Sequence, residues 1–143
     1  PVKVYVLRRE IGYFPGAGQI LMPGFSRFPP PEINQLRPCI IVSPKLPNRG
    51  ALAAVVPVSL TEPRKLLPYH VRLSKNYNPG EADDVACWAK CDLLMNISIG
   101  RMNGFKVGRR KWEHPQILAE DLKAVRRGIL HALGMADLLA RQS

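Results

Sequence analysis

An arginine placed directly before a short apolar strand is the feature of this sequence best suited to chemistry. Arg37 precedes Pro38, and the apolar run CIIV (39–42) follows. Proline excludes the α-helical conformation for the residue before it, so Arg37 is held extended where the strand begins. Its guanidinium is always charged, and its planar fork matches two oxygens of a phosphate. A cation held in this way is preorganised to stabilise negative charge on a phosphorane-like transition state.

Two hydroxyl side chains stand at the end of a second apolar run, VVPVSLTEP (55–63). Ser59 and Thr61 are two residues apart, so at the end of a strand both can point to the same side. In that position they could contact a ligand at the rim of a sheet. The alternative is that they cap a turn, as Ser and Thr often do.

A tryptophan, a cation and a carboxylate alternate along DVACWAKCDLL (84–94). If this segment is a strand, one side is small and apolar, and the other carries Trp88, Lys90 and Asp92. That second side is either a nucleic-acid-binding surface or a cross-strand salt bridge beside a half-buried tryptophan. His70 alternates with Tyr69 in PYHVRL, and a single histidine in a strand is more often structural than catalytic.

The spacing of cysteine and histidine indicates neither a metal centre nor a disulfide. Cys87 and Cys91 would lie about 13 Å apart along an extended strand, too far to bond to each other. No histidine pair or further cysteine completes a zinc site at the usual spacing. We therefore expect no metal and no cofactor.

The run RMNGFKVGRRKW (101–112) carries five cations and no acid, with two aromatic residues between them. Cations bind phosphates and aromatic rings offer stacking faces, a combination that suits single-stranded nucleic acid. The alternative is a basic loop on a basic protein. The candidate RNA-binding residues of this run are Arg101, Lys106, Arg109, Arg110 and Lys111. Two candidates lie outside it: Arg27 in the proline-rich loop, and Trp88.

Charge and length limit the class of protein. The 143 residues suffice for one domain with a single core, and 21 Lys and Arg against 11 Asp and Glu leave a net charge of +10. Such an excess suggests a polyanionic partner or an acidic protein that covers a basic face, although it could serve solubility alone. No apolar segment approaches the ~20 residues that span a bilayer. Three cysteines, an odd number, favour a reducing compartment, and we expect a cytoplasmic protein.

The chain is expected to form a mainly β fold with one helix (α+β), because short strands precede one clear helix. Strands are expected at 18–22, 39–43, 51–60, 69–73 and 84–94, with a stiff proline-rich loop between the first two, which favours a small barrel or sandwich. From Pro115, apolar residues recur at helical spacing, with Gly134 suited to the position after the helix. We expect one domain, 1–143, with an N-terminal extension (1–14, a strand or a tail) and a C-terminal helical segment (114–140). The last residues either extend the helix or form a second one. The core-facing helical positions are Leu118, Leu122, Val125, Ile129 and Leu133.

In order along the chain, these pieces resemble the MazF/PemK family of toxin ribonucleases. The matching segments lie between residue 18 and about residue 103, and the C-terminal helix fits as well. They are GQILM, PEINQLRPCIIVSP, VVPVSLTEP, PYHVRL and WAKCDLL. The resemblance implies a small SH3-like β-barrel with a terminal helix, acting as a homodimer. It also implies metal-independent cleavage of single-stranded RNA, in which the ribose 2′-OH attacks the adjacent phosphorus and leaves a 2′,3′-cyclic phosphate and a 5′-OH end.

The resemblance also assigns roles to individual residues. Arg37 matches the acid or transition-state stabiliser, and Ser59 matches the residue that binds the scissile phosphate. Possible assisting residues are Glu32, Lys90, Asp92, Thr61 and His70, of which Lys90 matches an arginine proposed as the general acid. The implied partner is an acidic antitoxin that covers the RNA groove. Two alternatives remain: a gyrase poison of the CcdB type, and a barrel that binds RNA without cutting it.

Overall fold

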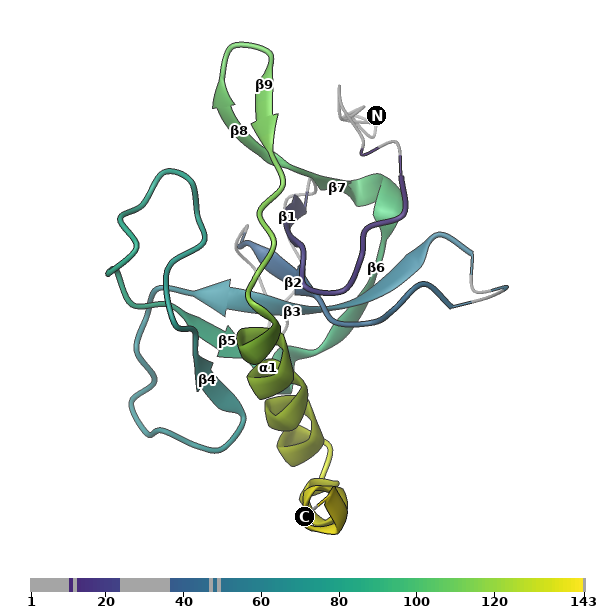
Figure 1. The fold of residues 1–143 in the computed structure, drawn as a ribbon, viewed down its shortest axis with the longest axis vertical. Coiled ribbons are helices and arrows are strands. Elements are labelled where there is room, and N and C mark those ends of the chain that lie inside the picture. The colour runs from purple at the N-terminus through teal and green to yellow at the C-terminus, as the bar shows by residue number, and fades with distance from the viewer. Residues whose placement is uncertain (1–10, 12, 24–36, 47, 49, 143) are drawn as a thin grey trace, which may run out of the picture.

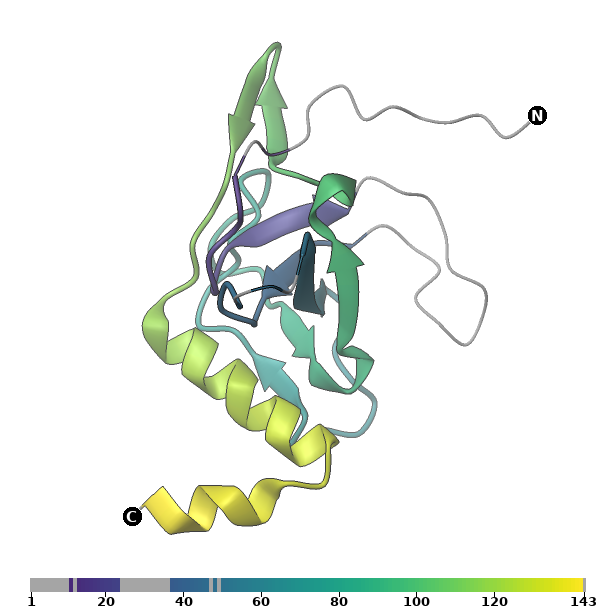
Figure 2. The ribbon, with the colours of Figure 1, turned by 90° about the vertical axis from the view of Figure 1, so that its right-hand side faces the viewer.

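The computed structural model describes residues 11, 13–23, 37–46, 48 and 50–142. Most of the expected N-terminal extension and most of the proline-rich loop lie outside these residues. In Figures 1 and 2 the strands form one body with the helix α1 against it.

The centre of the molecule is an antiparallel sheet whose neighbouring strands run in the order β4-β5-β3-β2-β1-β7, with β6 also paired to β3 (Figure 1). The expected α+β class is confirmed, and each of the five expected strands overlaps one of these strands. Among the described strands the path ends at β4 and at β7, and closure into a barrel is not observed. The strands are β1 (Ile20–Pro23), β2 (Cys39–Ile41), β3 (Leu52–Ser59), β4 (His70–Arg72), β5 (Trp88–Lys90), β6 (Met95–Ser98) and β7 (Met102–Asn103).

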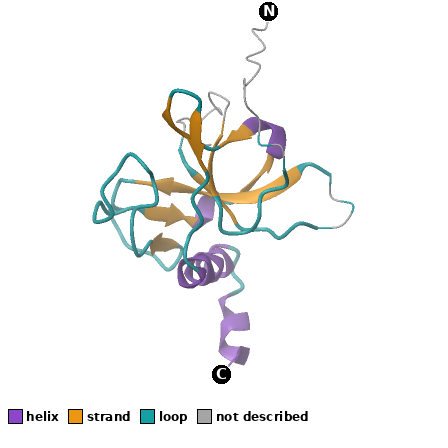
Figure 3. Cartoon of the chain, turned by 45° about the horizontal axis from the view of Figure 1, so that its top comes forward, coloured by secondary structure: helices purple, strands orange, loops and turns teal. Residues whose placement is uncertain are grey.

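The basic run 101–112 is mostly a hairpin and not a loop. Strands β8 (Phe105–Gly108) and β9 (Lys111–Glu113) form a separate two-stranded sheet, with a register irregularity between Lys106 and Gly108. Arg110 turns the chain at a φ of 59°. The hairpin stands at the end of the molecule opposite α1 in all three views (Figures 1, 2 and 3).

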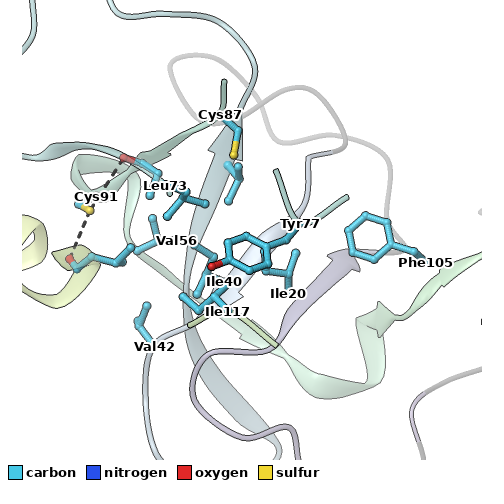
Figure 4. Packing of buried hydrophobic residues seen from close by; sticks show 13 residues of the cluster. Ile20, Ile40, Val42, Val56, Leu73, Tyr77, Cys87, Cys91, Phe105 and Ile117 are labelled. Carbon is cyan, nitrogen blue, oxygen red and sulfur yellow. Dashed lines mark hydrogen bonds between the residues drawn. The ribbon is translucent and has the colours of Figure 1, made fainter. Parts of the chain in front are cut away.

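The expected strand 84–94 is mostly wrong, because only Trp88–Lys90 is extended. The chain turns at once into the 3₁₀ helix η1 (Cys91–Leu93), where the Cys91 thiol donates to the carbonyl of Val125 on the helix at 3.4 Å (Figure 4). The strand stops here because packing against the helix replaces further pairing. Two consequences contradict the sequence interpretation: Asp92 leaves the face of Trp88 and Lys90, and Trp88 is buried and not exposed.

The expected C-terminal helix is observed as α1 (Ala119–Ala132), but it begins four residues after Pro115 and not at the start of the expected segment 114–140. Gly134 follows it at a φ of +72°, and the Met135 N–H donates to the Leu130 carbonyl at 2.7 Å, a pattern that satisfies the free carbonyls of a helix end. The last residues form a 3₁₀ helix, η3 (Ala136–Gln142), which is one of the two outcomes expected. Leu118 and Leu133 were expected to face the core but are more than half exposed, because they flank the helix beyond its contact with the sheet.

Buried apolar side chains cover both faces of the sheet, as strand alternation requires. One cluster lies between the sheet and α1 and includes Ile40, Val56, Tyr77 and Val125 (Figure 4). The other lies on the opposite face and includes Ile41 and Val55 among others. The 3₁₀ helix η2 (Ile99–Arg101) connects β6 to β7. None of the described helices is long and apolar enough to cross a membrane.

Candidate active site

The two residues of greatest chemical interest meet at one end of the sheet. Cys39 on β2 faces Pro57 on β3, so the same antiparallel register sets Arg37 opposite Ser59. The Arg37 Nη1 donates a hydrogen bond to Ser59 Oγ at 2.8 Å, across 22 residues of sequence. Pro38 contributes to the register, because its carbonyl accepts from the Val58 N–H at 2.8 Å. Strand pairing therefore builds this pair.

The Ser59 hydroxyl oxygen accepts two hydrogen bonds, one from Arg37 and one from the Thr61 N–H at 3.1 Å. A serine hydroxyl has two lone pairs and one proton, so the remaining capacity of Ser59 is its O–H donor. Ser59 is only 5% exposed. This arrangement favours a donor to an anionic oxygen over a nucleophile, whose lone pair would have to be available. The Ser59 hydroxyl does cap a turn, by accepting from the Thr61 N–H, as the alternative interpretation held.

The register extends this pair across two further strands. Ser59 faces Trp88 on β5, and Trp88 faces Arg72 on β4. Paired residues of an antiparallel sheet point to the same face, so Arg37, Ser59, Trp88 and Arg72 form one row. Three of these residues were candidates from the sequence, whereas Arg72 was not. The alternation in YHVRL already put Arg72 on the face of His70, and this pattern could have indicated it.

Lys90 and His70 lie in the next row on the same face, facing each other across β5 and β4. The His70 Nδ1 accepts a hydrogen bond from the Leu67 N–H at 3.1 Å, and its ring stacks edge-on against Tyr69 at 4.6 Å. The Nδ1 of His70 thus closes the turn before β4. The exposed Asp92 belongs to η1 and lies outside these rows.

A cavity of about 250 Å³ borders the site, and Arg37 and Thr61 are among its lining residues. Most of its other walls are apolar and buried, including Ile20, Tyr77 and Phe105, which lie near one another in Figure 4. Phe105 begins the β8–β9 hairpin, so the base of the basic hairpin and Arg37 border the same space. The sheet thus brings together a cation, a hydroxyl donor and an apolar hollow.

A model of one protein family matches residues 17–133, and its description is a PemK-like, MazF-like toxin of type II toxin-antitoxin systems. The chain belongs to this family. Comparison with curated proteins gives no significant match.

Solved structures of MazF proteins share the fold of this PemK/MazF family member. MazF (Form-I) from Deinococcus radiodurans is 24% identical, with a TM-score of 0.61 over 86% of this chain and 99% of that one. A MazE–MazF complex (Form-II) from the same organism is 22% identical, with a TM-score of 0.58 over 86% and 98%. A mycobacterial endoribonuclease in complex with its cognate antitoxin is 17% identical, with a TM-score of 0.57 over 85% and 96%. Such identities establish similarity of fold alone.

The expected RNA-binding cations of this PemK/MazF member are not all in one part of the fold. Those in the described part of the chain are exposed, and most stand on the hairpin that projects beyond the sheet (Figure 2). Arg101 ends η2 instead. Glu32 and Arg27 lie outside the described residues. The cations in and near the hairpin are Arg101, Lys106, Arg109, Arg110 and Lys111.

The three cysteines are all buried and free. Burial raises the pKa of Cys39 and of Cys91 to about 12, and it raises the pKa of Cys87 as well. Thiols with such pKa values stay protonated at neutral pH, so none of them suits a nucleophile. Within the described ranges, no group of three or more His, Cys, Asp and Glu side chains could hold a metal ion.

Proposed function

We propose that this protein is the toxin of a type II toxin-antitoxin system and cleaves single-stranded RNA without a metal ion. The observation that carries the proposal is the contact between Arg37 and Ser59 at 2.8 Å, in a chain that belongs to the PemK/MazF family. The pair presents a fixed cation beside a hydroxyl whose free capacity is a donor. Both suit a phosphate whose charge increases during reaction.

The proposed reaction is an internal transesterification. The ribose 2′-oxygen bonds to the adjacent phosphorus and its proton passes to a base, while the bond from phosphorus to the 5′-oxygen breaks and that oxygen takes a proton. The products are a 2′,3′-cyclic phosphate and a 5′-OH end. Arg37 stabilises the charge on the non-bridging oxygens, and Ser59 donates its O–H to one of them. The substrate supplies the nucleophile, in keeping with a serine oxygen that already accepts two hydrogen bonds.

Other residues have secondary roles in this proposal. Lys90, one row from Ser59 on the same face, is the proposed donor of the proton to the leaving oxygen. His70 and Thr61 are proposed to contact the substrate, Glu32 and Asp92 to assist, and Arg27 and the cations of the hairpin to bind phosphates along the strand.

The proposed partners follow from charge and family. An acidic segment of an antitoxin would cover the basic face of a protein whose net charge is +10, and MazF relatives have been solved with their antitoxins. We further propose a single domain with an SH3-like barrel, a homodimeric assembly and a cytoplasmic location.

The test is cleavage of single-stranded RNA by the purified protein in EDTA, with the chemistry of the new ends identified. Arg37→Ala should abolish cleavage and leave the circular dichroism spectrum unchanged, whereas Arg127→Ala, which removes an exposed charge from α1, should leave cleavage unchanged. Cleavage that requires added metal, or that survives Arg37→Ala, contradicts the mechanism. RNA binding without cleavage indicates a binding protein, and DNA cleavage in the presence of gyrase indicates a CcdB-like poison.

A further inference from the structure

The row of side chains that contains Arg37 and Ser59 continues past the proposed catalytic pair. Ser59 faces Trp88, and Trp88 faces Arg72, so the row crosses four neighbouring strand positions on one face. Adjacent strands are ~4.8 Å apart, so the backbones of Arg37 and Arg72 are separated by roughly 14 Å. An arginine thus stands at each end of the row, with a hydroxyl and an indole between them.

Arg72 is an exposed cation that makes no hydrogen bond or ion pair with any described residue. It lies at the end of β4, the outermost strand of the described sheet on that side. The acidic residue nearest to Arg72 in the sequence is Glu81, in the exposed loop after β4, and the one nearest to the facing strand β5 is Asp92, in η1. The charge of Arg72 is therefore available to an anion from outside the described chain.

Trp88 supplies a second, independent observation. Its side chain is 7% exposed, and its indole Nε1–H is buried without an acceptor in the described chain. A buried donor without a partner costs about 1–3 kcal/mol. Such a cost is offset when a bound ligand supplies the missing acceptor. Trp88 lies between Ser59 and Arg72 in the row, and we infer that the missing acceptor is an oxygen of a ligand that contacts those two residues.

We propose that Arg72 and the indole N–H of Trp88 form a second backbone-binding subsite, which holds the phosphate and ribose next to the scissile phosphate. This inference rests on the proposed ribonuclease function, because it takes the Arg37–Ser59 pair as the cleavage point. The fork of Arg72 binds the phosphate, and the Trp88 N–H donates to an oxygen of the same sugar-phosphate unit. These contacts read no base, so the subsite fixes the register of the RNA and leaves sequence choice to other residues.

The subsite makes a distinct kinetic prediction for Arg72. Its phosphate undergoes no reaction, so Arg72→Gln should raise KM about tenfold and leave kcat nearly unchanged, whereas Arg37→Ala should remove kcat. Arg72→Lys should restore part of the affinity, because it keeps the charge and loses the fork. Arg127→Gln is the matched control, since Arg127 is also exposed and lies on α1, on the other face of the sheet.

The decisive experiment measures binding without cleavage. A short single-stranded RNA with a 2′-O-methyl group on every ribose cannot supply the attacking hydroxyl, and its dissociation constant can be followed as salt is raised. Loss of a cation that binds one phosphate reduces the slope of log K against log salt by about 0.7. We expect this reduction in Arg72→Gln and no change in Arg127→Gln. Trp88→Phe should weaken binding with the slope unchanged, because it removes a neutral donor.

Equal salt slopes of RNA binding for Arg72→Gln and Arg127→Gln would contradict the proposed subsite. Unchanged RNA binding in Trp88→Phe would show that the indole is not part of it. Both results leave the proposed function intact if Arg37→Ala still abolishes cleavage. If the wild-type protein cuts no RNA but Arg72→Gln lowers the slope, the proposed function fails and the phosphate site stands.

Discussion

A buried carboxylate joins the C-terminal helix to the wall of the cavity beside Arg37, and its removal gives a quantitative test of the fold. Asp121, in the first turn of α1, accepts hydrogen bonds from the Ser74 N–H at 3.2 Å, from the Ser74 hydroxyl at 2.6 Å and from the Tyr77 hydroxyl at 2.5 Å. The Tyr77 oxygen in turn accepts from the N–H of Leu118 at 3.0 Å. The network therefore connects the start of the helix to the loop after β4.

Asp121→Asn should lower the free energy of unfolding by about 2–3 kcal/mol, since a hydrogen bond to a charged group contributes about 1.5–3 kcal/mol. Both hydroxyls donate to the same oxygen, Oδ2, so asparagine keeps these two bonds only when its amide oxygen takes that place. Its amide nitrogen then faces the Ser74 N–H, donor against donor. In the opposite orientation the hydroxyl proton of Tyr77, which is only 8% exposed, loses its acceptor. Either orientation leaves a donor without a partner, and this accounts for most of the cost.

Glu120→Gln is the matched control, because it removes the same charge from the same helical turn at an exposed position. Loss of a favourable charge near the helix N-terminus costs about 0.3–1 kcal/mol, and this applies to both variants. The assay is urea unfolding of both proteins at neutral pH. With a urea m-value of about 1–3 kcal/mol/M, Asp121→Asn should lower the midpoint by about 1 M relative to Glu120→Gln. Midpoints that differ by less than the fitting error would falsify the assigned hydrogen-bond energies.

Three further predictions concern packing, pH and charge. Gly128→Ala should lower the free energy of unfolding by about 1 kcal/mol and lower Tm with it. The added Cβ would lie 2.7 Å from Cys91 Sγ and 2.8 Å from Val71 Cγ2, and the cost of this overpacking outweighs the gain in helix propensity. Because burial raises the pKa of Cys91 from 9.0 to about 12, stability should be full below pH 9 and fall up to about pH 12; unfolding of Cys91→Ala at several pH values should show a shallower fall. Replacing Arg109 or Lys111 on the hairpin with glutamine should lower the salt slope of RNA binding by about 0.7 for each phosphate that the residue neutralises, and a slope equal to that of wild type would exclude the residue from the RNA path.

The sequence predicted the strands and the helix where local pattern decides the outcome. The run at 51–60 became β3 because alternating apolar side chains bury both faces of a central strand, and Gly134 marked the end of α1 through its positive φ. The prediction of a strand over 84–94 was wrong because the pattern of small residues after Lys90 fits a strand as well as the pattern before it does. What ends β5 is the packing of Cys91 beneath α1, a contact across 34 residues that no local pattern reveals.

The same distinction holds for the candidate site. Arg37 and Ser59 could be predicted from the chemistry of an arginine and a serine and from their places at the ends of apolar strands, and the structure brings the two into contact. Trp88 was expected either on a binding surface or half-buried beside a salt bridge, and it is buried. Alternation indicates which face a side chain occupies but not what covers that face. Arg72 was missed for a related reason: its importance depends on strand register, which sets it opposite Trp88.

Register also explains how one short sheet could support catalysis and binding at the same time. Each position along the row is contributed by a different strand, so a slip of one residue in any pairing would move a member of the row to the other face. The buried apolar partners on both faces of β3 prevent such a slip, because it would expose Val56 or Val58. The rigidity that the proposed transition-state contact of Arg37 requires thus comes from the core beneath it. Substitutions in that core should therefore impair RNA cleavage and protein stability together, whereas Arg72→Gln should separate the two.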